Sequence, residues 1–218
     1  FRDARLAFFP AMTNHGTIWF STVGRAAAWL GMEGAKYPEL LVNTSEELAV
    51  SVRQAQPVRS LRVGWIAING IEQQSEDQTV QQVLTALQNA TGHSFPTKEY
   101  WQHIVACTVL LDETNFYRLV ETCLERRTCN RVDQDTGTVA AGALFSYEAL
   151  PRASLLYSKV VAEPNFTGAI DGNYSSPVEV CALATEGFAR MGIGGMQTRG
   201  LGSLLVELSG TEVGNGCV

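Results

Sequence analysis

The chain has 218 residues, a formal net charge of −6 and a hydrophobic fraction of 45%. The length supports one substantial core, and the composition excludes a disordered chain and a membrane span, which needs roughly 18 consecutive apolar residues. The negative charge argues against a protein that coats nucleic acid over its whole surface, but it leaves room for a local basic groove.

The first half of the chain alternates strand and helix patterns. β-Branched and aromatic residues predict strands over 6–9 and 17–23, separated by a break at Pro10, and then a helix over 25–32. Capping-box spacings predict two further helices, over 44–54 and 75–92. The apolar run 62–68 between them predicts a buried strand.

The pattern continues with a short helix over 97–106 and a strand over 108–111. Asp112 is placed as the N-cap of the next helix, which carries Phe116 and Leu119 on one face. Residues 126–133 and 138–145 flank a turn at 134–137 and predict a hairpin. The remaining predicted elements are a strand over 154–162, a helix over 178–189, a glycine-rich loop and a strand over 204–208.

This order lacks the regular βαβ rhythm of a doubly wound parallel sheet. It predicts an α+β fold with an antiparallel sheet of ferredoxin-like or RRM-like type and helices on one face. We expect a single domain over 1–218, with an extended hairpin at 126–151 and the glycine-rich loop at 192–202.

The glycine-rich loop is the strongest single motif. Five glycines in eleven residues let the backbone approach a ligand and expose amide groups to an anion, and Arg199 adds a permanent positive charge. The loop precedes a predicted strand and carries no Gly-Lys-Ser/Thr, so neither nucleotide fingerprint fits. A flexible turn without a ligand is the alternative. The candidate contacts are Gly194, Gly195, Gln197, Thr198, Arg199, Gly200 and Gly202.

The predicted hairpin combines basic and apolar side chains. This mixture suits a surface that grips a phosphate backbone and wedges between bases. The alternative is a solvated hairpin whose apolar residues belong to the core. The candidate residues are Arg126, Arg127, Asn130, Arg131, Leu144 and Phe145.

Catalytic and metal-binding patterns are weak. The three histidines His15, His93 and His103 stand far apart, and the five cysteines form no CxxC pair and no ligand spacing with them. Asp133 and Asp135 lie at a turn, where aspartate commonly stabilises the turn itself. The odd, scattered cysteines and the absence of a signal peptide predict reduced thiols in the cytoplasm.

Three segments together resemble the RAMP-superfamily backbone subunit of type III-B (Cmr) CRISPR effector complexes. Residues 2–10 (RDARLAFFP) are similar to the family's Asp-Ala-Arg-Leu-Leu-x-Phe-Pro stretch. Residues 136–157 are similar to the segment that forms the family's extended hairpin, or thumb. Residues 194–202 are similar to the glycine-rich loop before its last strand. The order and spacing of all three match.

The resemblance implies a filament of ferredoxin-like subunits along a guide RNA. Each thumb would insert into the guide–target duplex, and the glycine-rich loop would lie against the guide backbone. The expected partners are guide RNA, target RNA and other copies or homologous RAMP subunits. Cleavage of the target would use a divalent metal ion, Mg²⁺ or Mn²⁺, in the complex, with no cofactor bound by this chain alone.

One departure from the family concerns catalysis. The family's essential Asp lies in an N-terminal segment, and we expect this chain, which starts at Phe1, to lack that segment. We therefore carry over no catalytic residue. Two alternatives to a structural subunit stay open: a share in a target-RNA endonuclease site, and an unrelated phosphate-binding enzyme or interaction module.

Overall fold

The computed structural model describes residues 3–32, 49–52, 59–72, 76–90, 97–140, 142–161 and 177–208. The chain divides into two compact units where the sequence predicts one domain. Residues 4–157 form the larger unit, and residues 1–3 and 158–218 form the smaller. Among the described residues, no helix is long and apolar enough to cross a membrane.

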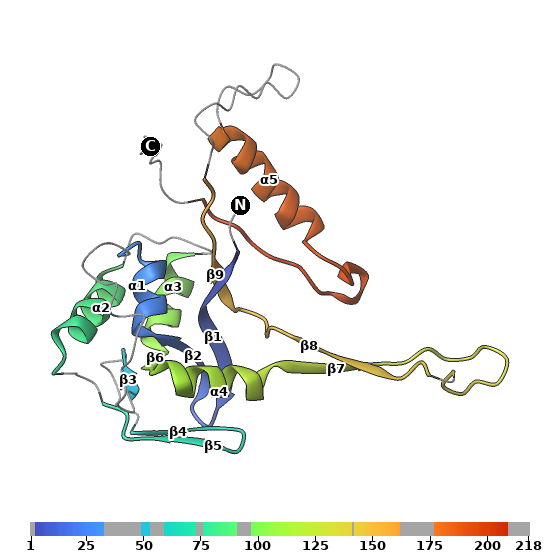
Figure 1. Ribbon diagram of the computed structural model, residues 1–218, viewed down its shortest axis with the longest axis horizontal. Coiled ribbons are helices and arrows are strands. Elements are labelled where there is room, and N and C mark those ends of the chain that lie inside the picture. The colour runs from blue at the N-terminus through green and yellow to red at the C-terminus, as the bar shows by residue number, and fades with distance from the viewer. Residues whose placement is uncertain are drawn as a thin grey trace. The chain divides into compact units, whose positions relative to one another are not determined.

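A five-stranded sheet forms the centre of the larger unit (Figure 1). Its strand order is β3 (Ala49–Ser51), β6 (Thr108–Leu111), β2 (Gly16–Thr22), β1 (Arg5–Thr13) and β9 (Leu155–Tyr157). β2 and β6 run parallel, and the other neighbours run antiparallel. The sheet is therefore mixed, which corrects the expected antiparallel sheet. The α+β class is confirmed.

Pro10 lies inside β1, although the sequence predicts a break there. It pairs with Trp19 of β2, while β9 pairs only with residues 5–8 on the other side of β1. Pro10 therefore falls where β1 has an open edge, and a missing N–H group costs no ladder hydrogen bond there. A bulge between Leu6 and Phe8 turns Ala7 and Phe8 toward the same core.

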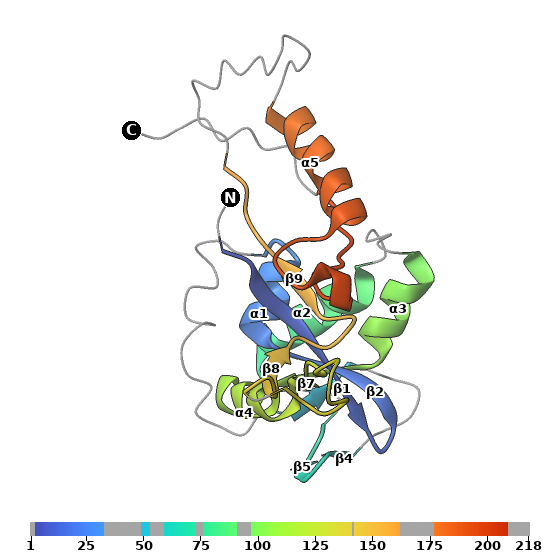
Figure 2. The same ribbon diagram turned by 90° about the vertical axis from the view of Figure 1, so that its right-hand side faces the viewer.

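Helices pack on both faces of the sheet, which corrects the expectation of helices on one face (Figure 2). Phe8 and Trp19 pack with α1 (Val23–Trp29), α2 (Gln78–Asn89) and α3 (Lys98–Ala106). Phe9 and Phe20 pack on the other face with α4 (Glu113–Cys123) and with the hairpin of β4 (Ser60–Val63) and β5 (Ile66–Asn69). Adjacent residues reach opposite faces because side chains alternate along a strand.

The helices begin at capped residues. Thr22, Asp77, Thr97 and Asp112 each accept a hydrogen bond from a backbone N–H in the first turn of α1, α2, α3 and α4. Such a cap stabilises a helix by about 1 kcal/mol. The predicted helices over 97–106 and after Asp112 are confirmed. The helix predicted to start at 75 instead has its cap at Asp77.

Three predicted strands differ from the structure. The run 62–68 is a hairpin, because Gly64 adopts a left-handed backbone (φ 58°) and allows β4 to turn into β5. Within the described part of the stretch 154–162, which ends at residue 161, only residues 155–157 form a strand, and residues 204–208 form none. The helix predicted over 44–54 lies partly outside the described residues, and residues 49–51 form β3.

A second hairpin leaves the sheet of the larger unit. β7 (Glu125–Cys129) follows directly from α4 and pairs with β8 (Phe145–Ala149). The sequence predicts a hairpin here, but with its second strand over 138–145. The chain returns to β9 through a turn in which the Ser154 hydroxyl donates to the Pro151 carbonyl (2.8 Å). The Trp19 indole N–H donates to the Ala153 carbonyl (3.1 Å) and fixes this turn to β2. Both ends of the hairpin are thus anchored.

The smaller unit contains α5 (Pro177–Met191), which confirms the helix predicted over 178–189. The helix ends at Gly192, whose left-handed backbone (φ 73°) is the usual way to stop a helix. The Gly192 N–H still donates to the Phe188 carbonyl (2.8 Å). The glycine-rich loop therefore starts at a defined point, the C-terminus of α5.

Candidate nucleic-acid interface

The hairpin of β7 and β8, residues 125–149, is called the arm below. Figure 1 shows it running away from the C-terminal end of α4. Past the paired strands, Val132 bridges Val139, and the Ala140 N–H donates to the Arg131 carbonyl (2.9 Å). The two sides of the hairpin therefore stay in contact up to the turn at 133–138.

The arm separates the predicted arginines between its two faces. Arg127 pairs with Tyr147 and Cys129 with Phe145, so these four side chains share one face. Arg126 pairs with Glu148 and lies on the other face. The structure thus brings Arg127 and Phe145 together, as the sequence predicts, and places Arg126 apart from them.

Two of the arginines of the arm are paired with carboxylates. Arg126 bonds Glu148 (3.2 Å), and Arg127 bonds Glu125 (2.9 Å), which raises the pKa of Arg127 above its ordinary value. Arg131 is exposed and makes no ion pair with any residue that the structure describes. A phosphate could therefore bind Arg131 without displacing a carboxylate of a described residue. At Arg126 and Arg127 it would have to compete with Glu148 and Glu125.

The outer part of the arm exposes large apolar side chains. Leu144 is 67% exposed and Phe145 is 43% exposed, and Val132 and Val139 are also exposed. A two-stranded hairpin gains little stability by itself in water, and these side chains do not bury themselves in the core. The arm is therefore a projection with an apolar surface beside basic groups, which excludes the alternative that these residues belong to the core.

Asp133 holds the turn of the arm together. Its Oδ1 accepts hydrogen bonds from the backbone N–H groups of Asp135 (2.9 Å) and Thr136 (3.1 Å). These bonds favour the charged carboxylate and lower the pKa of Asp133 below its ordinary value. Asp133 thus stabilises the turn, as the sequence analysis expects for aspartate in this position.

We expect the Asp133 carboxyl group to titrate below the ordinary value of 3.8. The charged carboxylate stabilises the turn above that pH, and this contribution is lost as the pH falls through the folded-state pKa. Carboxyl carbon shifts measured by NMR against pH report the value. The same titration in urea is the control, because the unfolded chain restores the ordinary pKa. Equal midpoints in the two titrations would contradict the expectation.

The glycine-rich loop is exposed and has a defined backbone. Gly194 and Gly200 adopt left-handed conformations (φ 80° at each), as does Met196 (φ 61°). Gln197–Arg199 form a single 3₁₀ turn, closed by the Gly200 N–H that donates to the Gln197 carbonyl (2.9 Å). Arg199 and Gln197 lie on the solvent side of the loop.

The base of the loop is closed by its own backbone. The Ile193 N–H donates to the Gly202 carbonyl (2.9 Å), and a Cβ atom at Gly202 would overlap the Ile193 carbonyl. The tip is open, because a Cβ at Gly194 or Gly195 would meet nothing within 4 Å. Among the described residues, the amides of Gly194 and Gly195 donate to no backbone carbonyl. The loop can therefore offer these amides to an anion.

Comparison with known proteins identifies the family. A family model described as the RAMP superfamily matches residues 33–205, well over half of the chain. The chain belongs to the RAMP superfamily. Its predicted glycine-rich loop and arm both lie within the matched residues, the loop in the smaller unit and the arm in the larger.

Individual proteins similar to this chain are Cmr proteins. The CRISPR system Cmr endoribonuclease Cmr4 of Pyrococcus furiosus is 24% identical over 210 residues, which cover 94% of this chain and 67% of that protein. Two solved structures share the fold of this RAMP-superfamily chain, each with a TM-score of 0.51. One is a chain of the type III-B Cmr-beta structure solved by cryo-EM in the apo state (15% identity; 92% of this chain, 66% of that chain). The other is oligomeric Cmr4 from Pyrococcus furiosus (18% identity; 91% and 68%). The chain thus spans about two thirds of the length of these relatives.

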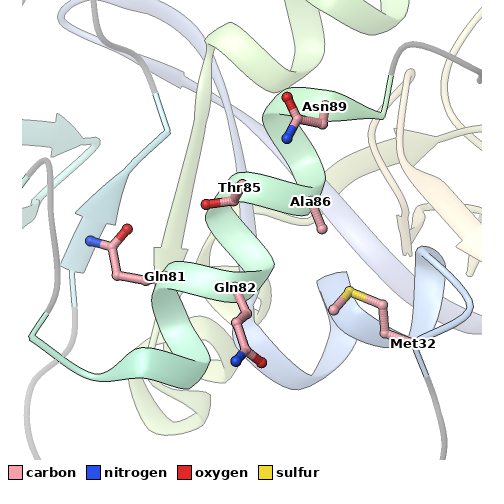
Figure 3. Close-up of a pocket in the computed structure, with 6 residues that line it drawn as sticks. All are labelled: Met32, Gln81, Gln82, Thr85, Ala86 and Asn89. Carbon is pink, nitrogen blue, oxygen red and sulfur yellow. The ribbon is translucent and has the colours of Figure 1, made fainter.

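Side chains that could ligate a metal ion do not cluster in the described part of this RAMP-superfamily chain. This part contains no group of three or more His, Cys, Asp or Glu side chains that could hold a metal ion. A hollow of about 420 Å³ lies along α2 (Figure 3). Met32 lines one side, and the remaining lining residues are Gln81, Gln82, Thr85, Ala86 and Asn89 of α2. These groups are neutral and provide neither a nucleophile nor an acid–base pair.

One exposed residue was missed by the sequence analysis. Trp65 is 82% exposed at the turn between β4 and β5, whereas the sequence predicts a buried strand there. The signal that could have revealed it is Gly64, which interrupts the apolar alternation of Leu61 and Val63. A glycine inside an apolar run is compatible with a tight turn that exposes its neighbour.

Proposed function

We propose that the chain is a guide-RNA-binding backbone subunit of a type III CRISPR effector, which holds the guide–target RNA duplex for cleavage of the target in antiviral defence. The observation that carries the proposal is the arm, a projection whose exposed apolar side chains lie beside arginines. Membership of the RAMP superfamily and the likeness to Cmr4 support it.

The arm suits the role of a thumb. Exposed Leu144 and Phe145 can insert between stacked bases, where each aromatic contact with a base stabilises the complex by about 1–3 kcal/mol. Arg127 shares the face of Phe145, and exposed Arg131 lies two residues beyond the end of β7. These arginines would bind the phosphates on either side of the inserted side chains, and Asn130 would add neutral hydrogen bonds.

The glycine-rich loop suits the guide backbone. The amides of Gly194 and Gly195 and the guanidinium of Arg199 can bind phosphate oxygens, and the Gln197 side chain can donate to ribose or phosphate. The sequence predicts Thr198, Gly200 and Gly202 for the same contact. Gly200 and Gly202 also shape the loop, since the Gly200 N–H donates within it and the Gly202 carbonyl accepts within it.

The finer fold and the chemistry of cleavage are parts of the same proposal. The central sheet with α1–α3 on one face supports a ferredoxin-like core for the larger unit. No catalytic residue is assigned in this chain. The described residues do not form a ligand set for Mg²⁺ or Mn²⁺. Other RAMP subunits are the expected partners in the assembled complex.

The double substitution Leu144→Ala and Phe145→Ala tests the arm. In a complex assembled with guide RNA and partner subunits, we expect target RNA to bind about tenfold more weakly, because the base contacts of the arm are lost. A 2-aminopurine base in the duplex should also lose the bright emission of an unstacked base. Fluorescence titration measures both effects.

Leu156→Ala is the matched control for the arm. Leu156 is as exposed as Phe145, at 43%, but it lies on β9 outside the arm. The control should bind target RNA like the wild type. If the double variant also keeps wild-type affinity and bright 2-aminopurine emission, the arm is no thumb and the proposed function loses its main support.

A further inference from the structure

Trp65 is the most exposed large apolar side chain of the described residues, at 82%. It sits at a tight turn, because Val63 pairs with Ile66 and only Gly64 and Trp65 connect the two strands. An indole is a large apolar group that proteins rarely leave in water without a partner. Neither the arm nor the glycine-rich loop accounts for this residue.

One face of the hairpin that carries Trp65 packs against the core of the larger unit. Leu61 and Val63 of β4 are buried in the core with Phe9 and Phe20 of the sheet. Arg62 lies between them in sequence and therefore on the opposite, solvent face of β4, where it pairs with Ala67. The solvent face carries small or polar side chains beside a single cation.

A second turn is tied to this hairpin. Asn14 lies between β1 and β2, and its Oδ1 accepts from the Arg62 N–H (2.8 Å) while its N–H donates to the Arg62 carbonyl (3.2 Å). The Thr13 hydroxyl donates to the Gly16 carbonyl (2.8 Å) and accepts from the His15 N–H (3.0 Å), which tightens the turn. His15 is exposed next to Asn14.

Asn14, His15, Arg62 and Trp65 are called the paired-turn surface below. The chain contains 22 acidic residues, yet none occurs in the stretches 5–22 and 59–71, which include the two turns and their strands. This local absence of acidic residues in a chain of net charge −6 favours an anionic partner. The small side chains around Arg62 do not form the apolar centre that a protein interface needs.

We propose that the paired-turn surface binds single-stranded RNA, with a base stacked on Trp65 and an adjacent phosphate bound by Arg62. An exposed aromatic ring and a cation on the same hairpin are the kinds of group by which proteins hold unpaired nucleotides without reading their sequence. The paired-turn surface would be a further RNA-binding site of the proposed subunit. This inference rests on the proposed function only in the assumption that the ligand is RNA. The paired-turn surface contacts nucleotides outside the duplex that the arm engages.

Trp65 variants of the full chain test the proposal with a labelled oligouridine of about 12 nucleotides, within the site sizes of single-strand binders. Trp65→Ala and Trp65→Leu should bind about tenfold more weakly, because both lose the aromatic face. Trp65→Phe should keep most of the affinity. Arg62→Ala should lower the slope of log K against log salt by about 0.7. Thermal unfolding verifies that each variant is folded, as expected for an exposed residue.

The outcomes separate this site from the glycine-rich loop. Arg199→Ala and its control Arg190→Ala, exposed on α5 of the same unit, enter the same titration. If Arg199→Ala weakens binding and Trp65→Ala does not, the paired-turn surface is refuted and the proposed function stands. If only Trp65→Ala weakens binding, the proposed surface stands without the loop contact. A wild-type chain that does not bind oligouridine overturns the proposal. A Trp65→Leu variant that binds like the wild type also overturns it, because the aromatic face would then not be needed for binding.

Discussion

Replacing Gly202 by alanine is expected to distort the glycine-rich loop and to weaken guide-RNA binding by about tenfold or more. Gly202 has a left-handed backbone (φ 73°), and an added Cβ would overlap the Ile193 carbonyl that lies against it. The overlap is with backbone, so no side chain can move aside to relieve it. The loop must open at its base, and its amides and Arg199 then lose their common orientation. Losing one or two hydrogen bonds to a charged phosphate accounts for the tenfold effect.

Gly195→Ala is the matched control for Gly202→Ala. Gly195 lies in the same loop, but its backbone is not left-handed, and a Cβ there would meet nothing within 4 Å. We expect it to leave the loop intact and to change guide retention by less than Gly202→Ala. Retention is measured by filter binding of labelled guide RNA across a salt series. Equal retention by the wild type and Gly202→Ala would show that the loop geometry does not matter for binding.

Replacing Arg25 by alanine is expected to lower the free energy of unfolding of the larger unit by about 2–3 kcal/mol. Arg25 of α1 donates to the Leu6 carbonyl (2.9 Å) and to the Tyr117 hydroxyl (2.8 Å), and it pairs with Glu113 (3.3 Å). Its guanidinium also lies 4.7 Å from the centre of the Phe116 ring. One side chain thus joins β1, α1 and α4, and α4 leads directly into the arm.

The control for Arg25 is Arg118→Ala. Arg118 is exposed on α4, and within the described residues it makes no ion pair, so its removal should change stability by less than about 0.5 kcal/mol. Arg25→Lys should recover only part of the lost stability. The compact ammonium group of lysine lacks the planar set of N–H donors with which the guanidinium reaches three partners at once. Urea unfolding followed by circular dichroism measures all three variants. A stable Arg25→Ala variant would mean that packing against the sheet alone holds α1 and α4 in place.

The elements with strong local signals were predictable. Thr97 and Asp112 are capping residues placed before amphipathic runs, and α3 and α4 begin after them. The hairpin of the arm follows from the Asp and Gly of its turn, and the helix before the glycine-rich loop ends at a glycine. In each case the deciding interaction joins residues within about four positions of each other, so the sequence contains it.

The sequence names candidate residues for the site, but it does not contain their arrangement. The sequence groups Arg126 with Arg127, whereas strand alternation separates them onto opposite faces and leaves only Arg127 with Phe145. Strand register and side-chain geometry decide which carboxylate pairs with each arginine. Composition alone does not predict these pairs. Trp65 is exposed because Gly64 turns the chain. The sequence around Gly64 is compatible with both a continuous strand and a hairpin, so it does not predict this turn.

The sequence by itself determined the α+β class, the capped helices, the arm and the glycine-rich loop that ends α5, because local propensity and short-range hydrogen bonds decide these features. Only the tertiary structure decided that β2 pairs parallel with β6, that Pro10 fits within β1, and that α4 covers the face opposite α1–α3. These arrangements depend on contacts between residues up to about a hundred positions apart, such as Thr22 with Glu113. Such contacts form when buried surfaces match in shape, and the alternation of apolar residues along one strand does not specify which surface will cover it.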